Sequence, residues 1–204
     1  NTSHPGSTRL LAEEAHAAAQ ATGMPAATVQ LLYRTSHGDG GRLVSDPRIG
    51  ATGYTGSRSA GLKLKAAADK AGKPIYLELS SVNPVVILSG ALEERLDDIV
   101  NQFVTSSLMG TGQFCTNPGL VILLAGEPTE NFLSAIVGKF KAAPVGTLLS
   151  AGVAKSLQQG IGQLIRAGAH TLVGGKNAAG QGYCQANTLL RASGQQFLEA
   201  PESL

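Results

Sequence analysis

The chain has 204 residues, of which 43% are hydrophobic and 15% are charged, and its formal net charge is +2. This length suffices for one large domain or two small ones, and the composition is typical of a globular chain. Lys and Arg are not clustered, which argues against nucleic acid as a partner. The longest apolar run, at 119–126, is too short to span a bilayer, and the first residues do not resemble a signal peptide. We therefore expect no membrane partner and a cytoplasmic location.

The first part of the chain predicts alternating helices and strands, an order that favours an α/β fold with parallel strands and right-handed crossovers. Apolar spacing and turn residues place the boundaries. The predicted elements are a helix from Ser7 or Thr8 to about Thr22, a buried strand at 28–33, a loop at 35–41, a short helix before Pro47, a strand at 49–54, a helix at 58–71 and a strand at 74–79.

The second part continues the alternation after a break at 80–84, the only soft boundary in the chain. We therefore predict two domains, 1–79 and 80–204. Apolar residues from Leu92 to Val104 form the clearest helical stripe. The predicted elements are strands at 85–88 and 120–124, a helix capped by Ser89, helices at 129–141 and 150–167, and strands at 169–173 and 183–190.

The stretch Gly110-Thr-Gly-Gln-Phe-Cys115-Thr-Asn-Pro-Gly119 holds one of only two cysteines. Glycines allow backbone amides to approach a substrate, and a thiolate in such a loop is a candidate nucleophile. The alternative is a small buried hydrophobe in a glycine turn. An isolated cysteine pair does not indicate a disulfide framework, and no His, Cys or Asp spacing resembles a zinc site, so we expect no metal.

Two further features are compatible with chemistry at a cleft. Thr55-Gly56-Ser57 lies between a strand and a helix, where free amides and the helix dipole can hold a phosphate; a plain turn with a Ser cap is the alternative. Glu78 shares a strand face with Tyr76. If that face is covered, burial raises the carboxyl pKa towards a value useful for a general base; if it is wet, Glu78 is a surface acid.

Three motifs, in this order, resemble the aldehyde dehydrogenase superfamily. Tyr54-Thr-Gly-Ser-Arg-Ser-Ala-Gly61 is similar to its cofactor-binding turn, Leu77-Glu-Leu-Ser-Ser-Val-Asn-Pro84 to its glutamate motif, and Gly112-Gln-Phe-Cys115 to its cysteine motif. The particular forms of the last two are most similar to the 2-oxoglutarate semialdehyde dehydrogenase branch, which often accepts NADP. The resemblance covers essentially the whole chain.

The resemblance implies a fold and a mechanism. The fold would be α/β, with a partial parallel-sheet Rossmann-type cofactor domain at 1–79 and a partial α/β catalytic domain at 80–204, truncated at both ends. Cys115 would attack the aldehyde and form a thiohemiacetal, and Glu78 would activate the water that hydrolyses the thioester. Ser57, shaped by Thr55 and Gly56, would hold the pyrophosphate of NADP or NAD. The resemblance also implies that the Leu79 backbone would meet the nicotinamide and that the Cys115 N–H would supply half of an oxyanion hole.

The chain also departs from this family, whose members are longer and usually form homo-oligomers. The family's upstream oxyanion-hole asparagine and cofactor lysine would precede Asn1, and its Glu-x-Phe-Gly-Pro segment would follow Leu204. Ser80 and Ser81 replace the more common Gly-Gly. Two alternatives to an active dehydrogenase therefore stay open: a fragment that has the fold without turnover, and a cysteine esterase that needs no cofactor.

Overall fold

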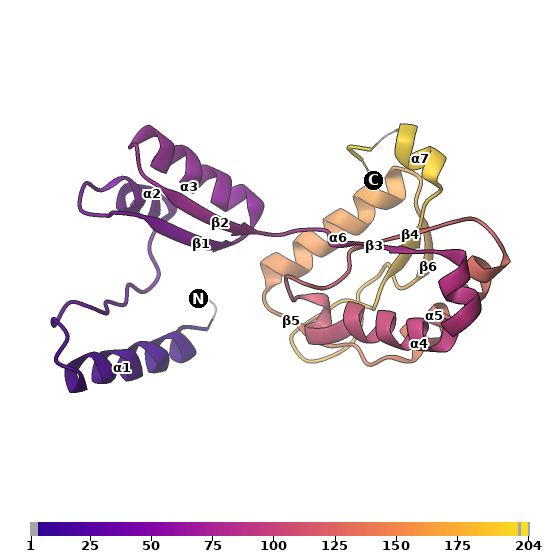
Figure 1. Cartoon of the computed structure of the whole chain (residues 1–204), viewed down its shortest axis with the longest axis horizontal. Coiled ribbons are helices and arrows are strands. Elements are labelled where there is room, and N and C mark those ends of the chain that lie inside the picture. Colours follow the sequence, from indigo (N-terminus) through magenta and orange to yellow (C-terminus); the bar gives the residue numbers. More distant parts are fainter. Residues whose placement is uncertain (1–3, 200, 204) are drawn as a thin grey trace. The chain divides into compact units, whose positions relative to one another are not determined.

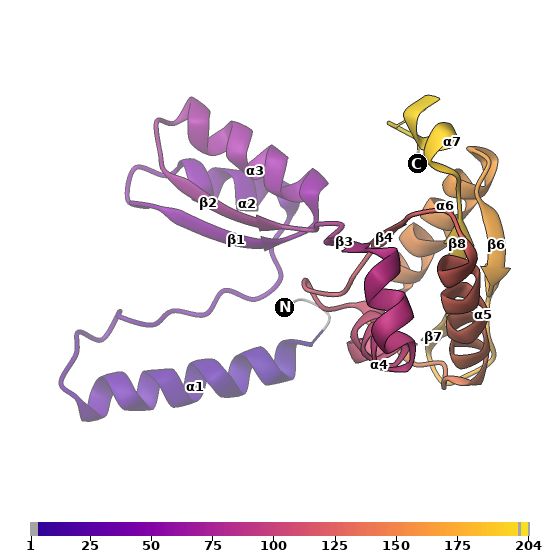
Figure 2. The ribbon, with the colours of Figure 1, turned by 45° about the vertical axis from the view of Figure 1, so that its right-hand side comes forward.

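The computed structural model describes residues 4–199 and 201–203. The chain divides into two compact units, one ending at Ser80 and the other beginning at Ser81. Figure 1 and Figure 2 show the helices and strands of each unit. The assignment of the first unit to cofactor binding and of the second to catalysis remains a prediction. No described helix has the length and apolar character needed to cross a membrane.

The first unit contains a two-stranded parallel sheet with a helix along one face. Its elements are α1 (Pro5–Ala21), α2 (His37–Ser45), β1 (Thr52–Gly56), α3 (Arg58–Lys70) and β2 (Ile75–Leu79). α3 lies along β1 and β2 in Figure 2. Ala68 on α3 is fully buried, and a Cβ at Gly61 would lie 2.4 Å from Cδ2 of Leu79, so α3 packs closely on the sheet.

The opposite face of this sheet is exposed. Burial alternates along β2, so Ile75, Leu77 and Leu79 face α3 while Tyr76 and Glu78 face outwards. Tyr76 is 71% exposed. Alternation along 75–79 thus predicted the two faces correctly. Parallel sheets are usually covered on both faces, so the exposure of the outer face of β1 and β2 is unusual.

The predicted strand at 28–33 is wrong. The segment is extended but pairs with no other described strand, and Leu32 and Tyr33 are more than half exposed. An apolar run becomes a strand only when a neighbouring backbone completes its hydrogen bonds. The expected loop at 35–41 is also too long, because α2 begins at His37, where the Ser36 hydroxyl accepts from the Asp39 N–H.

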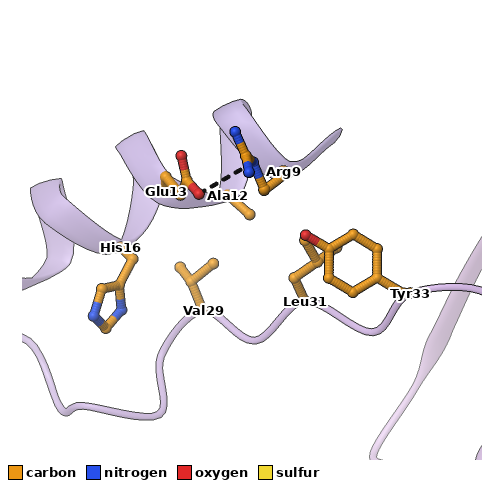
Figure 3. Close-up of a pocket in the computed structure, with 7 residues that line it drawn as sticks. All are labelled: Arg9, Ala12, Glu13, His16, Val29, Leu31 and Tyr33. Atoms are coloured by element: carbon orange, nitrogen blue, oxygen red, sulfur yellow. Dashed lines mark ion pairs between the residues drawn. The ribbon is translucent and has the colours of Figure 1, made fainter. Parts of the chain in front are cut away.

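Side chains from this extended segment face α1 instead (Figure 3). Val29, Leu31 and Tyr33 point towards the helix. Together with residues of α1 they border an open hollow of about 280 Å³, whose lining from the helix is Arg9, Ala12, Glu13 and His16. None of the predicted site residues lies there, so the hollow is not the candidate active site.

The second unit is built around two helices packed against a parallel strand pair. Its strands are β3 (Pro84–Ile87), β4 (Leu120–Leu123), β5 (Thr147–Leu148), β6 (His170–Val173), β7 (Tyr183–Cys184) and β8 (Leu189–Arg191). Its helices are α4 (Ser89–Leu108), the short 3₁₀ helix η1 (Met109–Gly112), α5 (Glu127–Ala142), α6 (Ala151–Arg166) and α7 (Gly194–Glu199). β3 and β4 pair in parallel, whereas β5–β7 and β6–β8 are antiparallel.

The core of this unit joins α4 and α5 to the sheets. Its buried members are Ile87, Leu92, Val100, Phe103, Phe132, Ile136, Phe140 and Val173. Three of them belong to the apolar stripe of α4, which confirms the helical spacing seen in the sequence. Leu88, rather than Ser89, is the N-cap residue of α4, and Arg95 interrupts the helix with φ −148° and ψ 48°.

The predicted strand at 183–190 is divided into two short strands. β7 pairs with β5, β8 pairs with β6, and the chain between them serves other contacts. The Asn187 side-chain amide donates to the Ala143 carbonyl oxygen at 3.2 Å. The segment between β7 and β8 is thus held by a residue more than 40 positions away rather than by strand pairing. A local sequence pattern could not predict this interruption.

One ion pair ties α5 to β8 and predicts a pH dependence. The Arg191 guanidinium donates to both Glu130 carboxylate oxygens at 3.0 and 2.7 Å, and this contact lowers the pKa of Glu130 below its usual 4.5. A lowered native-state pKa stabilises the fold above the unfolded-state pKa, and the contribution is lost as the pH falls through the native-state value. We expect Glu130→Gln to reduce the urea unfolding midpoint at pH 7 and to differ little from wild type at pH 3. An equal deficit at both pH values would contradict this.

The outer face of β3 and β4 is apolar and uncovered. Val86 is 63% exposed, and Ile122 and Leu124 are 48% and 58% exposed. Contiguous exposed apolar surface favours association. We expect the 204-residue chain to self-associate in light scattering, and we expect Val86→Lys to weaken this. A wild-type chain that is a monodisperse monomer would contradict the expectation.

Candidate active site

The carboxyl ends of β1 and β2 bring five predicted site residues together. In the parallel register Thr55 lies opposite Glu78 and Gly56 opposite Leu79, and Ser57 follows Gly56 directly. Because both strands run in the same direction, their carboxyl ends meet at one edge of the sheet, which is where α/β proteins place ligands. The sixth residue, Cys115, lies in the second unit.

The turn from β1 into α3 leaves hydrogen-bond donors unused. The first helical hydrogen bond runs from the Gly61 N–H to the Ser57 carbonyl oxygen, so the amides of 58–60 have no acceptor within the helix. The Ser57 side chain makes no capping hydrogen bond. A Cβ at Gly56 would lie 2.5 Å from the Tyr54 hydroxyl oxygen, so a larger residue there would have to displace the Tyr54 side chain. Such a donor-rich helix start fits a phosphate group.

Glu78 occupies the exposed face of β2. Its carboxylate has no ion pair or hydrogen-bond partner among the residues that the structure describes. Among the described residues, none therefore covers the face of Tyr76 and Glu78, so the covered alternative is not observed there. The carboxylate is free to meet water or a substrate at the strand end.

Cys115 lies in a tight loop between η1 and β4. The last three residues of η1, Gly110, Thr111 and Gly112, lead into this loop in the left-handed region, at φ 59°, 61° and 67°. A threonine there is uncommon, because its Cβ crowds the backbone. Cys115 is exposed and unpaired, rather than a buried hydrophobe, and Cys184 is also a free thiol.

Asn117 organises the interior of this loop. Its side-chain amide donates to the Ser106 and Met109 carbonyl oxygens, at 2.5 and 3.1 Å, and its Oδ1 accepts from the Phe114 N–H. The Asn117 N–H donates to the Phe114 carbonyl oxygen at 3.2 Å. Asn117 therefore binds two carbonyl oxygens near the end of α4 and both backbone polar groups of Phe114, its N–H and its C=O. These hydrogen bonds fix the path of the loop.

Two further residues fasten the loop to its surroundings. Gln113 accepts from the Leu149 N–H at 2.8 Å and so connects the loop with the segment after β5. Asn83 donates from Nδ2 to the carbonyl oxygens of Cys115, at 2.7 Å, and Asn117, at 3.0 Å. Gln113 and Asn83 lie within the sequence motifs described above, but no role was predicted for them. Asparagine and glutamine among glycines were a signal, since their amides satisfy irregular backbone.

Gly119 is the last residue of the loop, directly before β4 begins at Leu120. Its N–H donates to the Val82 carbonyl oxygen at 2.7 Å, and a Cβ on Gly119 would lie 2.6 Å from that oxygen. We expect Gly119→Ala to destabilise the second unit by about 1–3 kcal/mol, because backbone must move to relieve the clash. Gly138→Ala is the control: nothing lies near its Cβ on α5, so the helix should gain up to about 1 kcal/mol. Equal unfolding midpoints in urea for the two variants would contradict the close approach.

Comparisons with known proteins define the class to which this fold and these motifs belong. The profile of the aldehyde dehydrogenase family matches residues 3–197. The chain is 41% identical over 145 residues to alpha-ketoglutaric semialdehyde dehydrogenase 2 of Azospirillum brasilense, covering 70% of this chain and 28% of that protein. It is 34% identical over 142 residues to alpha-ketoglutaric semialdehyde dehydrogenase of Acinetobacter baylyi, covering 69% and 27%. The chain belongs to the aldehyde dehydrogenase family.

Solved structures agree with this fold. The similarity to lactaldehyde dehydrogenase from Escherichia coli has a TM-score of 0.69 with 26% identity, and covers 78% of this chain and 35% of that one. Glyceraldehyde-3-phosphate dehydrogenase GapN from Methanocaldococcus jannaschii gives a TM-score of 0.80 over 95% of this chain and 42% of that chain, at 24% identity. The chain thus spans less than half the length of these relatives, and about 28% of the first curated one.

Proposed function

We propose that this chain carries the nucleophile and the general base of an NAD(P)-dependent dehydrogenase that oxidises 2-oxoglutarate semialdehyde to the carboxylate. The observation that carries the proposal is the exposed Cys115 thiol in its asparagine-fastened loop, within a chain of the aldehyde dehydrogenase family. The substrate class is supported by the two alpha-ketoglutaric semialdehyde dehydrogenases to which the chain is 41% and 34% identical.

Cys115 would act as the thiolate, since this is the nucleophilic form of the side chain. Its sulfur forms a bond to the aldehyde carbon, and the carbonyl oxygen takes up the electron pair as an oxyanion. Once the hydride has left that carbon, the acyl group remains on sulfur as a thioester. Water then attacks the thioester, the carbon–sulfur bond breaks, and Cys115 is regenerated with release of the carboxylate.

The Cys115 N–H is available for the developing oxyanion. Because a trans peptide points its C=O and N–H in opposite directions, the hydrogen bond from the Asn117 N–H to the Phe114 carbonyl oxygen also orients the Cys115 N–H. No group among the described residues accepts from that N–H. A free, oriented donor stabilises charge as it forms.

Glu78 is the proposed general base for the hydrolytic water. A carboxylate without a hydrogen-bonding or ionic partner retains its acceptor oxygens for such a water, and Glu78 is in that condition on the exposed strand face. Glu78→Gln keeps the shape of the side chain and removes the base. We therefore expect it to affect hydrolysis more than thioester formation.

Thr55, Gly56, Ser57 and Leu79 would hold the cofactor, either NADP or NAD. The unused donors at the start of α3 and the glycine turn fit a pyrophosphate, with the Ser57 hydroxyl as a further donor. The Leu79 backbone, opposite Gly56, would meet the nicotinamide end. When bound, the nicotinamide supplies the hydride acceptor.

The test is cofactor reduction with a panel of aldehydes. We expect saturable NADPH or NADH formation, with the highest kcat/KM for 2-oxoglutarate semialdehyde over succinate semialdehyde and lactaldehyde. Ester hydrolysis that needs Cys115 and ignores the cofactor, with no aldehyde oxidation, would favour the esterase instead. Gel filtration of the active species tests the homo-oligomer that the family resemblance implies.

A second candidate is supported by the short match to the relatives. The chain covers only 28% and 27% of the two dehydrogenases named above. A chain of this length would then retain the fold and cofactor affinity without turnover. Binding of NADP by calorimetry, together with no NADPH formation from any aldehyde, would favour this candidate.

A further inference from the structure

Asn83 combines an unusual backbone with two hydrogen bonds into the Cys115 loop. Its φ is +50°, in the left-handed region that asparagine tolerates better than other residues with a Cβ. From there its side-chain amide donates at 2.7 Å to the carbonyl oxygen of Cys115 itself, 32 residues along the chain. The same amide donates at 3.0 Å to the Asn117 carbonyl oxygen. Both hydrogens of the amide are thereby used.

The two asparagines form one continuous support. Asn83 holds the carbonyls of Cys115 and Asn117. The Asn117 side chain in turn holds the Ser106 carbonyl of α4, the Met109 carbonyl of η1 and the Phe114 N–H. Next to Asn83, the Val82 carbonyl oxygen accepts from the Gly119 N–H. The support therefore sits where β3 and β4 begin side by side, with Pro84 opposite Leu120.

We propose that Asn83 and Asn117 are positioning residues, which hold the Cys115 loop in the single conformation that presents its thiol and its N–H to a substrate. Neither side chain bonds the thiol, so both act through the backbone around it. The proposal rests on the proposed function for its meaning in catalysis. Its test reads the loop and the thiol directly, so the two can fail separately.

Variants at Asn83 separate the backbone from the amide. Asn83→Gly keeps the left-handed conformation, which glycine adopts readily, and removes only the amide. Asn83→Asp keeps the shape but replaces a donor by a carboxylate that faces two carbonyl oxygens, one of them that of Cys115, and adds negative charge there. Asn131→Asp is the matched control, because Asn131 is exposed on α5 and takes no part in the loop.

Hydrogen exchange measures the order of the loop. The peptide 113–119 contains four hydrogen-bonded amides, those of Gln113, Phe114, Asn117 and Gly119. In Asn83→Gly we expect these amides to exchange roughly 5- to 50-fold faster than in the wild-type chain, as for the loss of two hydrogen bonds. Exchange in the α5 peptides should not change, and neither should exchange in Asn131→Asp.

Alkylation by iodoacetamide measures the thiol, with Cys184 as a reference in the same chain. In Asn83→Asp we expect Cys115 alkylation near neutral pH to be slower than in the wild-type chain, because the loop is no longer held and a negative charge close to the Cys115 backbone disfavours the reactive thiolate. Alkylation of Cys184 should keep its wild-type rate. If Asn83→Asp does not fold, exchange in Asn83→Gly decides alone.

Loop exchange that matches wild type in Asn83→Gly, or a lower thermal midpoint with unchanged loop exchange and thiol chemistry, would overturn the proposal. Altered exchange and alkylation in a chain that oxidises no aldehyde would leave the positioning role standing and remove the proposed function. Normal loop exchange in variants of an active chain would do the reverse.

Discussion

Cys115→Ser is expected to reduce aldehyde oxidation by roughly 10⁵-fold or more, to the background of the assay. Serine is close to cysteine in size, but its hydroxyl is not ionised near neutral pH and is a weak nucleophile without a base beside it. Losses of this size are typical when an enzyme loses its nucleophile. The measurement is kcat/KM from NADPH formation in a preparation that shows turnover.

Cys184→Ser is the matched control for this substitution. Cys184 is half-buried, and its thiol donates to the Gln181 carbonyl oxygen at 3.4 Å. We expect this variant to retain wild-type kcat/KM. Retention of aldehyde oxidation by Cys115→Ser, or a comparable loss in Cys184→Ser, would show that Cys115 is not the nucleophile.

Phe132→Ala is expected to destabilise the second unit by about 3–5 kcal/mol. Phe132 has no exposed surface, and its ring lies 5.8 Å from that of Phe103 at an interplanar angle of 59°. Removing the ring leaves a cavity between α4 and α5 that the two helices cannot close by themselves. Because net stabilities are about 5–15 kcal/mol, the loss should be visible as a large fall in the urea midpoint.

Phe197→Ala removes the same ring from an exposed position. Phe197 is 41% exposed on α7, so its loss should cost a small fraction of the effect at Phe132. Equal midpoints for the two variants would contradict the central place given to Phe132. An unfolded Phe132→Ala chain would agree with it, provided that Phe197→Ala folds normally.

Local features of the fold were predictable because short segments determine them. The strand, the Thr55-Gly56-Ser57 turn and the helix after it follow from apolar alternation, a glycine and a helix stripe within one stretch of chain. The order of strand and helix is as predicted, and α3 begins at Arg58. The strand itself lies at Thr52–Gly56 rather than at 49–54, so Thr55 and Gly56 belong to its end and only Ser57 separates it from α3. The parallel pairing of β1 with β2 followed from the helix between them. The loop around Cys115 was identifiable from its glycines.

Features that depend on distant residues were not predictable. The apolar segment 28–33 has strand composition but no strand to pair with, so it stays extended beside α1. The support of Asn83 joins residues 32 positions apart, and a sequence pattern does not show which carbonyls an amide will reach. The outer face of β2 leaves Glu78 exposed, so its proposed role as a base derives from the family and from its position at the strand end.

The most direct test of the account is the covalent state of Cys115 in Glu78→Gln during turnover. The protein is mixed with 2-oxoglutarate semialdehyde and NADP, quenched in acid and analysed by peptide mass spectrometry. We predict about one NADPH per active chain and an acyl thioester on Cys115, because the base for its hydrolysis is missing. Continued NADPH formation with Cys115 unmodified, or an acyl group on another residue, would contradict the account.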